Sequence, residues 1–137
     1  MTDINFEADQ LSIRLKLLSV DKNDIESMRC GVELDIVHPT GKIFYSADDI
    51  WLETKMLDEF SYKLSESVND RAEFYDMSNY LVISIRRRRT FHEVNIGIRE
   101  PLCGGGEATI ETRLHIALDG RFLIKLLHEI DKFRSFL

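Results

Sequence analysis

Four consecutive arginines, residues 86–89, are the most conspicuous group of reactive side chains in this sequence. Guanidinium groups bind phosphates and carboxylates, so such a run is typical of an anion or nucleic-acid site. Neighbouring side chains of a strand point to opposite faces, however, and only a turn would bring all four together. Carboxylates also follow closely, at Glu93 and Glu100. We therefore interpret the run as a solvated hairpin tip, with an anion site as the alternative.

The other side chains that could bind phosphate or metal do not form a recognisable motif. Residues 103–106 (CGGG) precede a predicted strand, whereas a phosphate-binding loop opens a helix. Histidines and cysteines lack the spacing of metal ligands: His38, His92, His115 and His128, with Cys30 and Cys103. No pattern marks a nucleophile beside its base. We therefore expect no catalytic residues, no enzyme activity, no metal and no cofactor.

Aromatic residues among carboxylates form a further candidate site, on a segment predicted to be helical. Its polar face carries Trp51, Lys55, Asp58, Glu59, Tyr62 and Glu66. Exposed aromatic side chains with an acidic rim are typical of a binding hot spot for a cationic protein. The alternative is that Trp51 packs in the core under the N-terminal segment or the turn at 38–41, because a lone tryptophan is more often buried.

Two segments have the 3.6-residue apolar periodicity of an amphipathic helix. The first is expected to begin at Ser46, a suitable N-cap, with Asp48 and Asp49 in its first turn. Its apolar stripe is Ile50, Leu57, Phe60 and Leu64. The second is expected to begin at Asp119, another suitable N-cap. Its apolar stripe is Phe122, Leu123, Leu126, Leu127, Ile130, Phe133 and Leu137.

Elsewhere apolar residues alternate with polar ones, which is the pattern of strands with one buried face. Strands are predicted at residues 11–18, 29–37, 42–46, 71–76, 80–86, 91–100 and 107–118, and residues 1–9 are predicted to be a loose lead-in. The order is βββαββββα. It predicts an α+β fold, a two-layer sandwich in which two helices cover one face of a curved antiparallel sheet of about seven strands.

Matching the apolar residues of the last strands predicts which charged residues meet on the outer face of the sheet. This register puts Glu93 opposite Arg113 and Arg99 opposite Glu107. The preceding hairpin puts Arg86 opposite Glu93 as well. The resulting face is an alternative site for a small anionic ligand or a nucleotide, and its residues are Arg86, Glu93, Arg99 and Arg113.

Length and composition predict a single domain, residues 1–137, with 44% hydrophobic and 31% charged residues. The net charge of −6 argues against nucleic acid as the partner and permits a basic protein. No window approaches the roughly 20 apolar residues of a membrane span. The acidic start, MTDINFEADQ, lacks the features of a signal peptide. We therefore expect a cytoplasmic protein, in agreement with the two cysteines.

Residues 45–137 resemble small bacterial immunity proteins of the WapI type. The resemblance is carried by IWLETKMLDEFSYKL, by the strands RAEFYD and YLVISI, and by the entry to the last helix, LDGRFLIKLLHEIDKF. It implies a non-enzymatic domain that neutralises a polymorphic toxin, often a nuclease, by direct association. The arginine run is not a feature of that family. Two functions are therefore considered: binding of a basic toxin, and binding of a small ligand on the outer sheet face.

Overall fold

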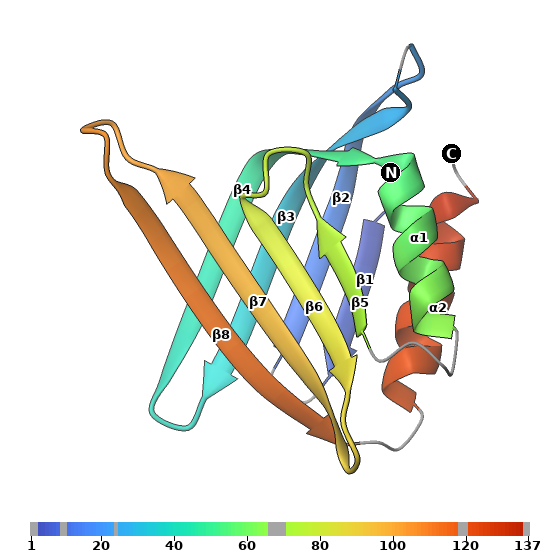
Figure 1. Cartoon of the computed structure of the whole chain (residues 1–137), viewed down its shortest axis with the longest axis vertical. Helices are drawn as coiled ribbons and strands as arrows, with labels where there is room; N and C mark the ends of the chain where they lie inside the picture. Colours follow the sequence, from blue (N-terminus) through green and yellow to red (C-terminus); the bar gives the residue numbers. More distant parts are fainter. Residues whose placement is uncertain (1–2, 9–10, 24, 66–70, 118–120, 136–137) are drawn as a thin grey trace.

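The computed structural model of the chain describes residues 3–8, 11–23, 25–65, 71–117 and 121–135. It consists of two antiparallel sheets and two helices (Figure 1). The first sheet and the helix after it are β1 (Asp3–Ala8), β2 (Leu11–Asp21), β3 (Ser27–His38), β4 (Gly41–Glu53) and α1 (Thr54–Ser65). The second sheet and its helix are β5 (Arg71–Tyr75), β6 (Leu81–Arg87), β7 (Phe91–Pro101), β8 (Glu107–Ala117) and α2 (Arg121–Arg134).

The predicted α+β class, with antiparallel strands and two helices, is confirmed, but the number of sheets is not. The strands form two sheets of four, in the orders β1-β2-β3-β4 and β5-β6-β7-β8, rather than one sheet of about seven. The reason is that α1 carries the chain from the first sheet to the facing one, so β5 begins a new sheet. The chain is therefore two successive units of four strands and a helix.

The eighth strand, β1, lies within residues 1–9. The prediction that these residues form a loose lead-in was therefore wrong for most of their length. Strand β1 pairs with β2 from Asp3 opposite Lys16 to Ala8 opposite Leu11. Ile4 is buried. The alternation of Ile4 with acidic and polar neighbours was the available indication of this strand.

The first helix begins at Thr54, so its predicted start at Ser46 was wrong. Strand β4 continues through Glu53 because its buried residues still alternate with exposed ones around Trp51. The predicted helix cap is instead followed by a β-bulge, in which Asp48 and Asp49 lie opposite the single residue Gly31. The predicted N-cap of the second helix, Asp119, lies outside the described residues.

The core lies between the sheets and is completed by the helices. Each helix packs against the first strand of the other unit, α1 on β5 and α2 on β1, and the two helices also contact each other. Figure 1 shows both helices on the same side of the molecule, beside β1 and β5. Leu126 and Ile130 of α2 are buried, as their positions on the predicted stripe required.

On the side away from the helices, a polar contact links the two sheets. The hydroxyl of Tyr45 on β4 donates a hydrogen bond to Glu100 Oε1 on β7, at 3.2 Å. Burial raises the pKa of Tyr45 to about 12, and this bond to Glu100 adds to the effect. Tyr45 is therefore a neutral donor near neutral pH.

Candidate functional site

The helix face predicted to bind a partner is present in part. Four of its residues are exposed on α1: Lys55, Asp58, Glu59 and Tyr62. They share a face because they recur at intervals of three or four residues. Glu66 lies outside the described residues. Trp51 does not belong to the helix, because it lies on β4, on the outer face of its sheet.

Within this face, Asp58 is held by the neighbouring helix. Arg134 Nε of α2 lies 2.7 Å from Asp58 Oδ1. Both side chains are partly exposed, so this ion pair stabilises the helix contact only modestly. The ion pair also affects binding, because a partner would have to compete with Arg134 for Asp58. Glu59 would be more accessible to such a partner.

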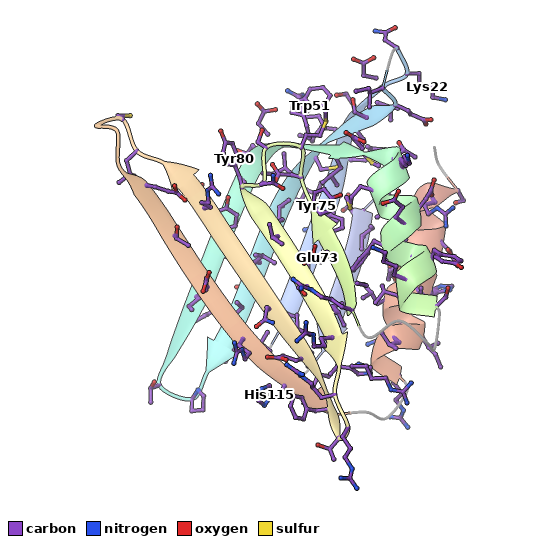
Figure 2. The ribbon with its side chains drawn as sticks, viewed as in Figure 1. Lys22, Trp51, Glu73, Tyr75, Tyr80 and His115 are labelled. Carbon is purple, nitrogen blue, oxygen red and sulfur yellow. The ribbon has the colours of Figure 1, made fainter. Side chains whose placement is uncertain are left out.

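A group of exposed aromatic and thioether side chains lies where β4 meets the turn between β5 and β6. The backbone amide of Met77 donates a hydrogen bond to the carbonyl oxygen of Trp51, at 2.8 Å, and this bond holds the turn against the strand. We call this surface the aromatic end. It comprises Trp51, Tyr75, Met77 and Tyr80, each between 36% and 46% exposed. Figure 2 shows Trp51, Tyr75 and Tyr80 at this end of the molecule.

A cleft of about 230 Å³ joins the aromatic end to the helix face. Its lining residues are Glu53, Lys55, Met56, Glu59, Tyr75, Asp76 and Met77. The three carboxylates and the single lysine give this cleft a negative charge. Trp51 does not line this cleft, and its link to the cleft is the backbone hydrogen bond from Met77 of the β5–β6 turn.

The turn that builds the aromatic end is fixed by Asp76, a buried residue. Its Oδ1 accepts a hydrogen bond from the Leu81 amide at 2.9 Å, and its Oδ2 accepts one from the Ser78 amide at 3.3 Å. Asn79 has a φ of 57°, a conformation that asparagine tolerates better than most residues. The side chains of Tyr75, Met77 and Tyr80 therefore project from a well-supported turn.

The alternative site forms on the outer face of the second sheet, around Glu93. The Glu93 side chain is only 7% exposed, with Arg88 Nε 2.8 Å from Oε2 and Arg113 Nε 3.0 Å from Oε1. The hydrogen bond from Arg88 is the main reason why the pKa of Glu93 is lowered. The charges of Arg88, Arg113 and Arg86 act in the same direction, while burial opposes them.

The register of β7 and β8 differs by two residues from the predicted one. The predicted pairing of Arg86 opposite Glu93 is confirmed, but Arg113 and Glu107 each lie two positions from the residue they were expected to face. A shift of two keeps every side chain on its predicted face. The ion pairs therefore form diagonally, and Arg99 Nε lies 2.7 Å from Glu107 Oε1.

This outer face is hollowed, with an open volume of about 860 Å³. Five arginines line it: Arg71, Arg86, Arg88, Arg99 and Arg113. The predicted residues of the alternative site are thus brought together, yet most of these arginines are already engaged by carboxylates. Arg71, for example, is paired with Glu73 and also donates from Nε to Ser84 Oγ at 3.2 Å.

We compared the chain with known protein families, curated proteins and solved structures. No protein-family model, curated protein or solved structure matches this chain. In the part of the chain that the structure describes, no helix is long and apolar enough to cross a membrane. Among the same residues, no group of three or more His, Cys, Asp or Glu side chains is placed to hold a metal ion.

Sequence reasoning missed the residues contributed by the β5–β6 turn. Tyr75 is exposed in keeping with the alternation of its strand, but nothing local indicated that the β5–β6 turn would lie against Trp51. That proximity depends on the second sheet facing the first. The inter-sheet bond between Tyr45 and Glu100 was missed for the same reason.

Proposed function

We propose that this chain is a non-enzymatic binding protein that neutralises a basic protein toxin in the cytoplasm by direct association. The observation that carries the proposal is the aromatic end with its four exposed side chains, two of which, Tyr75 and Met77, line a cleft together with Glu53 and Glu59. Tryptophan, tyrosine and methionine are enriched in protein interfaces, where they supply large desolvated contacts. The neighbouring carboxylates would form the polar rim and pair with basic groups of the partner.

The distribution of charge along the chain supports a basic partner at this end. Residues 1–70 carry 15 acidic and 7 basic side chains, a net charge of −8, whereas residues 71–137 carry 9 acidic and 11 basic ones, a net charge of +2. The negative charge therefore belongs to the part of the chain that contributes Trp51 and α1. Long-range attraction of this kind raises the rate of encounter with a cationic protein.

The resemblance to immunity proteins of the WapI type supports a protein toxin as the partner. It concerns the segment that includes α1, the turn-forming strands and α2, and these elements build the helix face and most of the aromatic end. Such proteins act by occupying a surface of the toxin. A surface of exposed aromatic side chains suits this action better than an enclosed pocket does.

The test begins with a search of the genes adjacent to that of this chain for an encoded toxin domain, whose inhibition of growth should be relieved by co-expression of this chain. In kinetic binding experiments, Trp51→Ala should mainly increase the rate of dissociation, by about 30-fold for a true hot spot. Phe44→Ala is the matched control, because Phe44 is also an exposed aromatic residue of β4 but lies outside the aromatic end. Equal binding by both variants would exclude the aromatic end.

The electrostatic contribution can be measured separately. Glu59→Gln should slow association and reduce its dependence on ionic strength, with little change in dissociation. Glu7→Gln removes the same charge from an exposed position on β1 and is the control. If the parent chain neither binds the toxin nor protects cells, the proposed function is wrong.

The second candidate function is binding of a small anionic ligand or nucleotide. The observation in its favour is the open hollow of about 860 Å³ lined by five arginines. Titration with ATP, followed by calorimetry, tests it directly. Saturable heat that is lost in Arg86→Gln would support this function over the first, because Arg86 lies in the hollow and outside the aromatic end.

A further inference from the structure

Strand β8 is an eleven-residue edge of the second sheet whose composition favours pairing with another strand. Within the described residues only its β7 side is paired. Its inward-facing residues include Ile110, Thr112 and Leu114, and none of its inward-facing residues is charged. Ile110 is 47% exposed although it faces the same way as the buried Ile98. Edge strands that avoid association usually carry inward charges, prolines or bulges.

The corresponding edge of the first sheet, β4, has the protection that β8 lacks. The bulge at Asp48 and Asp49 interrupts its pairing pattern opposite Gly31 and places two carboxylates on the edge strand. The register between β7 and β8, by contrast, is continuous over all eleven residues. The two edges therefore differ in their capacity to accept a further strand.

The most complementary partner for β8 is a second copy of β8. A two-fold axis at Thr112, the central residue of the strand, pairs all eleven residues in antiparallel register. Glu111 then faces Arg113 of the second copy twice on the outer face, and Ile110 faces Leu114 twice on the inner face. An axis at Glu111 would instead place two glutamates opposite each other, which is destabilising.

The side chains required for these contacts are available. Arg113 uses its Nε atom for both Glu93, at 3.0 Å, and Asn95, at 3.1 Å, so its terminal amino groups can reach a second carboxylate. The Arg113 side chain is 67% exposed, and Glu111 is exposed and makes no ion pair among the described residues. Pairing would also cover the exposed apolar surface of Ile110.

We propose that this chain forms a two-fold symmetric dimer through antiparallel pairing of β8 in two copies, centred on Thr112. The interface is isologous, so it closes on itself and leaves no further edge of this kind. The two second sheets then become one sheet of eight strands. The aromatic end is built from β4 and the β5–β6 turn, so the dimer is independent of the proposed function.

Disulfide trapping tests the register. Thr112→Cys should form an intermolecular disulfide on mild oxidation in a Cys103→Ser background, which removes the exposed native thiol. Directly opposite residues have Cα atoms about 4.5–5.5 Å apart, within the range that a disulfide spans. Thr109→Cys in the same background is the control, because the two copies of position 109 would lie about 20 Å apart. No cross-link at Thr112, or equal cross-linking at both positions, would overturn the proposal.

Solution mass and charge reversal complete the test. Light scattering should give a dimer mass for the parent chain, and a monomer mass at every concentration would refute the dimer. Glu111→Arg places arginine opposite arginine and should weaken dimerisation about tenfold or more. Glu107→Arg makes the same charge change on β8 but faces Ala117 in this register, so it should leave the dimer largely intact. Equal effects of the two variants would contradict the register, with circular dichroism showing that both are folded.

Discussion

The two units of this protein, β1–β4 with α1 and β5–β8 with α2, have the same order of elements and different surfaces. Each sheet is a simple antiparallel succession, and each helix packs on the first strand of the other unit. Their charges differ, however, with −8 on residues 1–70 and +2 on residues 71–137. The shared architecture therefore provides the core, while the surfaces of the two units are free to serve separate contacts.

The exchange of helices also means that the two units have no separate cores. Phe60 of α1 contacts Phe74 of β5 edge to face, with ring centroids 5.6 Å apart. In the other unit, Ile130 and Phe133 of α2 are buried in the same interior. Stability should therefore be a property of the whole chain.

The largest expected effect is that of Phe133→Ala, because Phe133 is fully buried. Truncation should lower the free energy of unfolding by about 3–5 kcal/mol. Phe60→Ala in the first unit should cost a similar amount. Chemical denaturation followed by both tryptophan fluorescence and circular dichroism should give one coincident transition for each variant. Separate transitions would show that the two units unfold independently, as two domains.

A smaller effect is expected from Tyr45→Phe, which removes the hydrogen bond that links the two sheets on the side away from the helices. The loss should be about 0.5–1.5 kcal/mol in the free energy of unfolding. Tyr62→Phe is the matched control, because Tyr62 is 62% exposed. Loss of its hydroxyl should therefore change the free energy of unfolding little. An equal loss in both variants would mean that the link to Glu100 does not stabilise the protein.

The raised pKa of Tyr45 predicts that the protein loses stability at alkaline pH. The folded state raises the pKa of Tyr45 from 10.0 to about 12, so it favours the neutral hydroxyl. This contribution is fully present below pH 10 and is lost as the pH rises toward 12. The difference in unfolding free energy between the parent and Tyr45→Phe should therefore shrink over this interval. A difference that stays constant up to pH 12 would contradict the assignment.

The smallest effect is expected from Glu93→Gln in the second unit, because the arginines around Glu93 are themselves exposed to water. The folded state lowers the pKa of Glu93 below 4.5. Its contribution is therefore present above that pH and is lost as the pH falls through the folded value. Thermal unfolding should show Glu93→Gln to be less stable than the parent at pH 7, with the difference disappearing in acid. A difference that persists in acid would indicate a packing effect.

The parts of the fold that were predictable are those decided by local alternation. Burial of Leu126 and Ile130 followed from the spacing of apolar residues, as did the faces of β6, β7 and β8. The register error of two residues left every face unchanged, which explains why the ion pairs of Glu93 and Arg99 were still anticipated. Local patterns determine the face of a side chain more reliably than its exact partner.

The errors occurred where two local interpretations compete or where distant segments meet. A serine followed by two aspartates is typical of a helix start, yet the alternation from Ile50 to Leu52 kept this segment in the sheet. The split into two sheets depends on the path of the chain after α1, which no local pattern encodes. The same applies to the aromatic end, because Trp51 and Met77 are neighbours only after the sheets have formed.

The contact between α2 and β1 has a consequence for biosynthesis. The Asn5 amide lies 3.5 Å from Glu129 Oε2, across a separation of 124 residues. At roughly 5–20 residues per second, a ribosome takes about 6–25 s to synthesise that interval. During this time the side of β1 that α2 later covers has no helix to shield it. The incomplete first unit must therefore remain unaggregated until α2 emerges from the exit tunnel.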